Sequence, residues 1–511
     1  MATNWQTFPI EFKGGLISNL SPLQQGANAV GSATILQNFE PARSGGYTKL
    51  QGYVKADDNV IPGSERVLGV KVVNPSEYIA ARNNGSVTEY HLSTGSGWSS
   101  LGTTALAGGK IRSAEYNFGA GHFVIFVDGT NAPKLYNDTT NTLSDITSNT
   151  DIQGAEQVAI FKNTVFFSKG SNLYFSAPSS STDFSSANGG GVINVSHGIT
   201  GLISFRDQLI IFSRNNIQRL SGTTLADFQL SPITESIGCL DPDTIQEVGG
   251  DVMYMSPDGI RLLGATDRIG DFALEVASDP IADDVYKFAQ STSNFCSIVV
   301  REKAQYRIFA YSESEQSKVA RGLLVTKFSN QGAESMAWGE SSGIKAYVAD
   351  SKYTSSAETI VFANEDGYLY QMEQGSSFDG ASIEAIYESP YMPISDPQIR
   401  KTFYKLTSYI DPKGPFSLDL STKYDFTRAN NQNLIQPAST TISSSGLAVS
   451  FYGAVVSRYN TATYGGELDK VYQNQIIGSG KTISIRIEDN STNPSFTLDT
   501  VLLEFTQNDR Q

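Results

Sequence analysis

A chain of 511 residues exceeds what one compact core usually holds, so we expect two or three domains. The composition, 39% hydrophobic and only 17% charged with 24 Tyr, 27 Phe and 46 Gly, favours sheets joined by turns over helices. The formal net charge of −15 argues against a protein that grips nucleic acid, because gripping phosphates needs clustered Lys and Arg.

The first 60 or so residues have few periodic signals. They carry Gly14-Gly15 and Gly45-Gly46-Tyr47, and we interpret them as an extended arm that docks on another surface. The opening MATNWQTFPIEFKGG has no basic segment followed by an apolar run, so we expect no signal peptide. No stretch reaches the roughly 18 apolar residues that a membrane-spanning helix needs, so we expect no membrane span.

A hairpin pattern then repeats along the chain. FKNTVFFSKGSNLYFSAP from Phe161 and FRDQLIIFSRNNIQRLSG from Phe205 both place an aromatic, a basic residue and Asn or Asp before two apolar strands. Similar copies follow and precede them, and their first strands open at Tyr78, Phe123, Val165, Leu209, Val252, Tyr306 and Thr359. Spacings between 42 and 54 residues match the period of β-propeller blades, whereas a long sandwich gives no reason for such a period.

The turns and strands of these repeats fit that fold. Asn84-Gly85, Asp258-Gly259 and Asp366-Gly367 supply the positive φ angles of tight turns, and Asp128-Gly129 serves a longer connection. The first strand of each hairpin, such as Leu209-Ile210-Ile211-Phe212, is apolar on successive residues, which indicates an inner strand covered on both faces. We predict a propeller of six to seven blades at residues 63–378, partly closed by strands within residues 1–62.

Beyond residue 378 the period stops. FSLDL from Phe416, KTISIRIED from Lys481 and FTLDTVLLEF from Phe496 alternate apolar and polar residues, as strands with one wet face do. RANNQNLIQPASTTISSSG, between the first two, is polar and typical of a loop. We therefore predict a β-sandwich-like domain at 379–511, and the clearest helix candidate runs from Asp279 to Gln290. The fold class is all-β.

Few motifs point to chemistry. GSGKT at Gly478–Thr482 resembles the end of a phosphate-binding loop, but Gln475 stands where that loop needs Gly and a strand follows, so a Gly-rich hairpin turn is the better interpretation. His91, His122 and His197 belong to different repeats and are not spaced as metal ligands. Cys239 and Cys296 lack metal-site spacing, and we expect buried free thiols.

Enzyme signatures are also weak. The sialidase Asp-box is absent since the segment near Trp98 lacks its Asp, and nothing selects a pair of acids for glycoside hydrolysis. Asp-rich turns such as that at Asn364 lack regular calcium-ligand spacing. We assign no catalytic, cofactor-binding or metal residue, expect no cofactor, and predict that the chain is not an enzyme.

The N-terminal arm resembles the signature of short-tailed bacteriophage tail proteins. That signature has a Gly-Gly-Leu segment, an Asn-Phe-Glu stretch and a Gly-Gly-Tyr…Gly-Tyr stretch. The matching positions here are Gly14-Gly15-Leu16, Asn38-Phe39-Glu40, Gly45-Gly46-Tyr47 and Gly52-Tyr53. The segments from Ile199 and from Ser256 resemble propeller blades of the tail nozzle proteins, also called tail stabilisation or tail accessory proteins.

The resemblance implies a structural virion protein made in the host cytoplasm. In that family a homohexamer forms the nozzle of the tail, below the portal and the head-to-tail adaptor protein, and extends the channel through which double-stranded DNA passes without specific recognition. Tail fibres or a tail-tip protein would be further partners. An acidic lining would keep the duplex sliding, since each Lys or Arg that neutralises a phosphate strengthens binding.

Two other functions fit the same sequence features. A propeller adhesin that binds host surface glycans would use the abundant Tyr, Asn and Ser. A polysaccharide-degrading tail enzyme would need an acidic pair that the linear sequence does not select.

Overall fold

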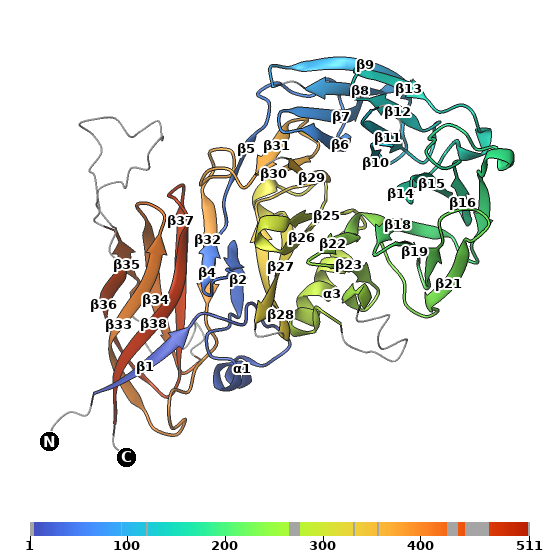
Figure 1. The fold of residues 1–511 in the computed structure, drawn as a ribbon. Coiled ribbons are helices and arrows are strands. Elements are labelled where there is room, and N and C mark those ends of the chain that lie inside the picture. Colours follow the sequence, from blue (N-terminus) through green and yellow to red (C-terminus); the bar gives the residue numbers. More distant parts are fainter. Residues whose placement is uncertain are drawn as a thin grey trace.

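The computed structural model describes residues 5–93, 95–118, 121–264, 276–330, 333–354, 357–426, 438–444 and 470–508. The protein is all-β: a β-propeller and a β-sandwich lie side by side, and an extended N-terminal arm runs between them (Figure 1). Both chain ends lie at the same end of the sandwich (Figure 1).

The described chain forms seven antiparallel propeller blades, of which six are separate sheets and one is part of a nine-stranded sheet that continues into the sandwich. The first blade contains β6 (Val67–Asn74), β7 (Glu77–Asn83), β8 (Val87–Ser93) and β9 (Trp98–Ala105), and the second contains β10 (Arg112–Tyr116), β11 (Phe123–Val127), β12 (Lys134–Asn137) and β13 (Thr142–Asp145). The third blade contains β14 (Gln157–Phe161), β15 (Thr164–Lys169), β16 (Asn172–Phe175) and β17 (Gly191–Asn194). The fourth contains β18 (Ile199–Phe205), β19 (Gln208–Ser213), β20 (Ile217–Ser221) and β21 (Gln229–Thr234). The fifth blade contains β22 (Gln246–Val248), β23 (Asp251–Ser256) and β24 (Gly259–Leu262), and the sixth contains β25 (Phe295–Val300), β26 (Gln305–Ala310), β27 (Arg321–Asn330) and β28 (Ala333–Ser342). The seventh contains β29 (Val348–Thr354), β30 (Ala357–Ala363) and β31 (Leu369–Met372) and is completed by β5 (Tyr53–Lys55).

The ring is closed by strands from both ends of the propeller sequence. β5 of the N-terminal arm pairs antiparallel with β31, the last strand of the seventh blade, and places Tyr53 opposite Met372. Tyr53 then packs its ring among Phe362, Tyr370 and Phe378, with centroids 5.0 to 5.2 Å away. The prediction of a propeller with closing strands in the arm is therefore confirmed, with seven blades.

The predicted hairpins exist, but their place within the blades differs from expectation. Their first strands are β7, β11, β15, β19, β23, β26 and β30, which are the second strand of each blade. The strands that surround the axis are those before them, since β10, β14 and β18, for example, contact one another in succession. The interpretation of the apolar runs as inner strands was wrong. Second strands are covered on both faces by neighbouring blades, whereas inner strands such as Arg112–Tyr116 face the axis and carry charge.

The repeated aromatic–basic–Asn/Asp motif forms the turn between the first and second strands. In the third blade Lys162 and Asn163 have φ of 47° and 57°, and in the fourth Arg206 and Asp207 have 46° and 61°, as a two-residue hairpin turn requires. Lys162 Nζ also lies 2.6 Å from Asp207 Oδ1 of the next blade. The Gly85 and Gly367 turns have positive φ as predicted.

Two sheets pack face to face to form the sandwich. The first contains β1 (Gln6–Glu11), β3 (Phe39–Pro41), β4 (Tyr47–Lys49), β38 (Phe496–Gln507), β33 (Lys401–Pro412) and β36 (Val471–Gly480). The second contains β2 (Ile35–Gln37), β32 (Ile383–Glu388), β37 (Ile483–Ser491), β34 (Ser417–Tyr424) and β35 (Thr440–Ser443). The strands predicted from Phe416, Lys481 and Phe496 are thus β34, β37 and β38. Of the predicted polar loop, residues 440–443 form β35 and much of the rest lies outside the described residues.

The second sandwich sheet continues into the propeller. β2 pairs antiparallel with β32 and makes a parallel bridge to β28 of the sixth blade, at Gln37 and Glu340. One apolar core accordingly includes Trp338 of the sixth blade together with Tyr387 and Phe403 of the sandwich. Because backbone pairing and core packing both cross the junction, the two modules form one body.

The N-terminal arm docks on its own chain. β1 pairs with β38 from Gln6 to Glu11, β3 and β4 form a hairpin whose second strand pairs with β38, and β5 completes the propeller. The expectation that the arm docks on another surface is therefore corrected, because its strands fill places in both modules.

Helices are short. α3 (Ala282–Ser291), preceded by the 3₁₀ turn η5 (Asp279–Ile281), confirms the predicted helix, and it buries Val285 and Phe288. α1 (Pro22–Asn28) was not predicted; Ser21 accepts a hydrogen bond from Gln24 N at its N-cap, and Pro22 follows. The remaining helical turns are η1 (Thr150–Ile152), η2 (Ser186–Asn188), η3 (Pro242–Thr244), η6 (Arg301–Lys303) and η7 (Ser317–Val319). Among the described helices, none has the length and apolarity to cross a membrane.

Candidate functional site

The titratable residues that the sequence drew attention to do not come together. His91 lies in β8 beside Glu89, His122 precedes β11 between Glu115 and Asp138, and His197 is exposed after β17. Cys239 and Cys296 are free and buried, and burial raises the pKa of each thiol to about 12, which confirms inert buried thiols. In the described part of the chain, no three His, Cys, Asp or Glu side chains are grouped as metal ligands would be.

The GSGKT segment connects the two sandwich sheets. β36 ends at Gly480 and β37 begins at Ile483, but β36 pairs with β33 whereas β37 pairs with β32 and β34. The segment is therefore a tight turn between strands, as expected, although it does not join two paired strands as a hairpin does. Asp425 Oδ1 accepts hydrogen bonds from Lys481 N (2.6 Å) and Thr482 N (3.1 Å), so a carboxylate of this chain occupies those donors.

The propeller axis is crossed by ion pairs. Arg112, on the inner strand of the second blade, makes a two-bonded contact of 2.8 and 3.0 Å with Asp243, which lies in η3 before the fifth blade. Lys110 Nζ lies 3.2 Å from the same carboxylate and donates to Phe295 O of the sixth blade. These side chains join blades on different sides of the ring, so a polymer cannot pass along the axis while they are in place.

A second group of axial charges links the seventh, first and second blades. Lys71 Nζ lies 3.2 Å from Asp350 and 3.8 Å from Glu115, and Lys352 Nζ lies 2.9 Å from Glu115. Between the two groups lies a cavity of about 180 Å³. Every charged side chain named here has a partner of opposite sign, and these ion pairs connect the blades around the axis.

The two acids at η3 have opposite electrostatic environments. Burial and then the neighbouring Asp243 raise the pKa of Asp241 to about 6. Burial acts in the same direction on Asp243, but Lys110 and Arg112 outweigh it and hold the pKa of Asp243 at about 2. Asp241 Oδ1 accepts from Asp243 N at 2.8 Å and so caps η3.

The Asn-Phe-Glu stretch of the arm forms a buried polar junction. The Glu40 carboxylate accepts from Lys303 Nζ (2.6 Å), Gln305 Nε2 (3.1 Å) and Arg307 (3.0 Å) of the sixth blade. Arg307 and Lys303 also pair with Glu373, which follows the seventh blade, and these cations outweigh burial to hold the pKa of Glu373 at about 2. The Arg307 side chain is 2% exposed, so the arm, the sixth blade and the seventh meet at a charge cluster shielded from water.

Asn38 and Lys49 extend this junction to the sandwich. Asn38 Nδ2 donates to Ser342 O (2.9 Å) and Glu384 O (2.8 Å), and its Oδ1 accepts from Ser342 N (2.9 Å), so one side chain bridges β28 and β32. Lys49 of β4 pairs with Asp489 of β37 at 3.0 Å, with both side chains at most 1% exposed. This buried pair joins the two sandwich sheets.

Three glycines of the signature lie where backbone approaches backbone. A Cβ on Gly15 would lie 2.6 Å from Trp338 O, one on Gly46 2.5 Å from Leu498 O, and one on Gly52 2.0 Å from Ser377 O. The Tyr47 side chain links two segments of the arm, since its hydroxyl accepts from Gly15 N (3.0 Å) and donates to Gly31 O (2.9 Å). Several of the residues that carry the family resemblance therefore share one role, which is to fix the arm between propeller and sandwich. We call residues Gly15, Asn38, Glu40, Gly46, Tyr47 and Gly52 with their contacts the arm junction.

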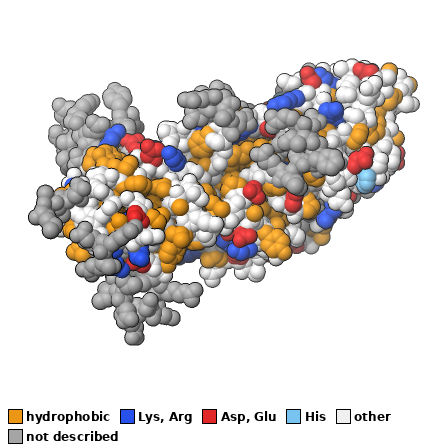
Figure 2. Space-filling view, turned by 90° about the horizontal axis from the view of Figure 1, so that it is seen from below, with side chains coloured by type: hydrophobic (Ala, Val, Ile, Leu, Met, Phe, Trp, Pro, Cys, Tyr) orange, Lys and Arg blue, Asp and Glu red, His pale blue; other side chains and the backbone are white. Residues whose placement is uncertain are grey.

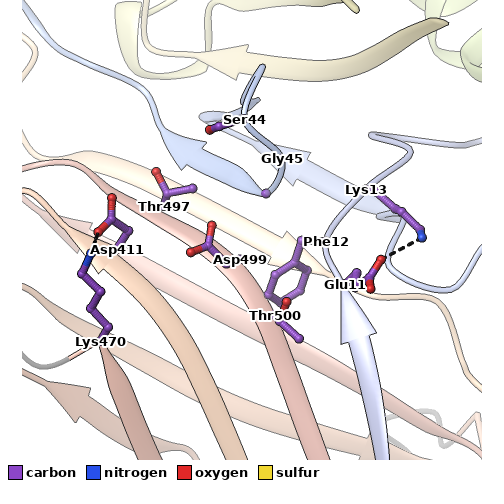
Figure 3. A pocket seen from close by; sticks show the side chains of 11 residues that line it. Glu11, Phe12, Lys13, Ser44, Gly45, Asp411, Lys470, Thr497, Asp499 and Thr500 are labelled. Carbon is purple, nitrogen blue, oxygen red and sulfur yellow. Dashed lines mark hydrogen bonds and ion pairs between the residues drawn. The ribbon is translucent and has the colours of Figure 1, made fainter. Parts of the chain in front are cut away.

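A pocket of about 590 Å³ lies beside the arm junction, between the end of β1, the β3–β4 turn and the edge of β38 (Figure 3). Exposed ion pairs flank it, Glu11 with Lys13 and Asp411 with Lys470, each at 2.9 Å, and Asp499 lies between them (Figure 3). Burial, and then the charge of Asp411, raise the pKa of Asp499. A single such carboxylate without a positioned nucleophile or base does not constitute a catalytic arrangement.

On the face seen in Figure 2, the Lys and Arg side chains of the described residues lie singly or beside Asp and Glu. The sequence pattern of the arm-junction residues does not predict their structural role. Their partners, such as Arg307 for Glu40 and Ser342 for Asn38, lie 267 and 304 residues away, so a linear pattern holds no signal of the contact.

Comparison with known proteins gives only distant likenesses. No protein-family model matches the chain, and no curated protein matches it. Among solved structures, the extracellular domain of a protein described as a hybrid two-component system of B. thetaiotaomicron is similar at a TM-score of 0.37 and 10% identity, over 61% of this chain and 40% of that one. YCF48 bound to a D1 peptide is similar at 0.36 and 10% identity, over 62% of this chain and 96% of that one. The chain thus matches less than half the length of the first of these structures.

Proposed function

We propose that this chain is a structural protein of a bacteriophage particle, the nozzle subunit of a short tail. The observation that supports the proposal most directly is the arm junction. The residues that resemble the family signature are the ones that fix the propeller to the sandwich, so the signature describes a rigid two-module subunit.

The closed axis constrains how such a nozzle would work. Because Arg112 and Lys110 bridge to Asp243 across the ring, the DNA channel does not run through one propeller. It lies between copies of the chain, which associate head to tail into a closed hexameric ring beneath the adaptor. The chain's net charge of −15 favours a lumen that does not retain the duplex.

The experiment is a count of copies in purified particles by quantitative mass spectrometry against the portal protein. We expect half as many copies of this chain as of the portal. Cryo-electron microscopy of the same particles should then place a six-fold ring below the adaptor. Absence of the chain from particles, or a three-fold count typical of fibres, would refute the nozzle assignment.

A further inference from the structure

Two aromatic rings stand exposed together at one end of the sandwich. Trp5 is 56% exposed and Tyr404 is 38% exposed, and their ring centroids lie 4.7 Å apart with an interplanar angle of 56°. The other two tryptophans are engaged elsewhere: Trp338 is buried in the core and Trp98 donates to Asn59 O. A pair of large rings left in water contributes little to the fold and marks a binding surface.

The backbone is built to present these rings. β33 pairs Phe403 with Phe505 and Lys405 with Glu504 of β38, so Tyr404 is an extra residue in a β-bulge. The bulge keeps Phe403 in the core and turns Tyr404 outward, as bulges that re-aim a side chain do. Along β1, Ile10 is buried while Thr7, Pro9 and Glu11 are exposed, and Trp5 continues this exposed alternation.

The rim of the aromatic pair is neutral and rich in hydrogen-bonding groups. Tyr404 Oη lies 3.2 Å from Thr506 Oγ1, Thr402 Oγ1 donates to Asn508 Oδ1 at 3.2 Å, and Gln507 Nε2 donates to Gln6 Oε1 at 3.1 Å. Of the cations nearest in sequence, Arg400 pairs with Asp425 at 3.0 Å and Lys405 with Glu504 at 2.7 Å. The third, Lys401, is buried and its Nζ donates to backbone carbonyl oxygens.

We propose that this surface, defined by Trp5 and Tyr404 with the rim of Gln6, Thr402, Thr506 and Asn508, binds the pyranose ring of a neutral or N-acetylated sugar. The face of a pyranose carries several C–H groups with slight positive charge, which suit the electron-rich face of an indole or phenol ring. Its hydroxyls, and the amide of an acetamido group, match the amides and hydroxyls of the rim. An anionic ligand would find no uncompensated cation among the residues named.

The test uses the full chain and saturation-transfer NMR with trisaccharides of N-acetylglucosamine, galactose and mannose. We expect at least one trisaccharide to receive saturation at its ring protons, with affinity in the millimolar range. Trp5→Ala and Tyr404→Ala should each weaken binding at least about tenfold, which corresponds to about 1.4 kcal/mol. Trp5→Phe, which keeps a ring, should retain part of the binding.

Tyr286→Ala is the matched control, because Tyr286 is 65% exposed on α3 and belongs to the propeller side. Its binding should equal that of the wild type. Circular dichroism and thermal unfolding of each variant exclude loss of fold as the cause. Failure of every trisaccharide to bind, or equal binding by Trp5→Ala, overturns the proposal.

Native mass spectrometry of the same variants separates this site from ring assembly. If Trp5→Ala forms the wild-type oligomer and only sugar binding is lost, the sugar site stands whatever the fate of the nozzle assignment. If Trp5→Ala abolishes the oligomer, the rings belong to a contact between copies and the sugar proposal is wrong.

Discussion

The propeller and the arm–sandwich region are held together by contacts of different range. Within the blades, strands pair with their neighbours in sequence, as β14 does with β15 and β15 with β16, except where β5 pairs with β31 to close the ring. In the sandwich, Gln6 pairs with Phe505, and Asn38 bonds to residues more than 300 positions away. The propeller repeat therefore depends mainly on contacts between strands that are close in sequence, whereas the sandwich forms only when strands from the beginning and the end of the described chain pair with each other.

Gly31→Ala should cause the largest loss of stability, because Gly31 lies in the arm–sandwich region that long-range contacts hold together. Gly31 has φ of +92°, and a Cβ there would lie 1.8 Å from Glu11 O at the end of β1. Since backbone cannot give way as a flexible side chain can, we expect a loss of about 4 kcal/mol in the free energy of unfolding, measured by urea denaturation. Gly45→Ala is the control: its φ is +99° but nothing lies within 4 Å, so strain alone should cost about 1–2 kcal/mol. Equal losses would show that the arm is not held by close backbone packing.

Glu40→Ala should have the next largest effect. It leaves the buried Arg307 and the partly exposed Lys303 with Glu373 as their remaining acid, so we expect a loss of about 3 kcal/mol, measured in the same way. Glu11→Ala removes an exposed acid from its pair with Lys13 and should cost less than about 0.5 kcal/mol. A Glu40 variant as stable as the Glu11 variant would contradict the arm junction.

The pH dependence of stability in Asp241→Asn tests the environment that the propeller axis gives to the Asp241 carboxyl group. The folded pKa of Asp241, about 6, exceeds the unfolded value of 3.8, so its contribution to stability is fully present below about pH 4 and is lost as the pH rises through 6. Asparagine keeps the acceptor that caps η3 but cannot ionise. The variant should therefore be more stable than the wild type at neutral pH, by about 2 kcal/mol, and this advantage should disappear near pH 4.

For Asp243, the expected pH dependence of the stabilising contribution is the opposite. Because Lys110 and Arg112 lower the pKa of Asp243 to about 2, its stabilising contribution is present above about pH 4 and is lost as the pH falls through 2. Asp243→Asn should thus lower the melting temperature at neutral pH. A melting-temperature difference for Asp241→Asn that does not vary with pH would rule out the assigned environments.

Ala304→Gly should cause the smallest change in stability, and its effect should be confined to the sixth blade. Ala304, in the turn between β25 and β26, has φ of 50°, which costs a residue with Cβ more than glycine. We expect a gain of about 0.5–1 kcal/mol, measured by thermal unfolding. Ala310→Gly, inside β26, should instead lose a similar amount, and two changes of the same sign would mean that the turn is not limited by its backbone conformation.

The sequence predicted the elements whose partners are close along the chain. Seven hairpins, their Asn-Gly and Asp-Gly turns and the helix at Asp279 are local patterns, and each is present. It did not predict that the apolar hairpin strands stand second in each blade, because an apolar run indicates a strand covered on both faces but does not indicate which strand of the blade is covered. Nor did it predict the Trp5–Tyr404 pair, since a bulge opposite a distant strand decides where Tyr404 points.

Because the strands of the arm pair with strands far along the chain, they cannot pair until those strands have been synthesised. The ribosome makes Gln6 and Tyr53 several hundred residues before their partners, Phe505 and Met372. Until those partners emerge, β1 and β5 are unpaired strand edges, a condition that exposes a nascent chain to aggregation. A chain interrupted before β38 lacks the partner strand of β1, so its arm cannot take the position that it has in the folded protein.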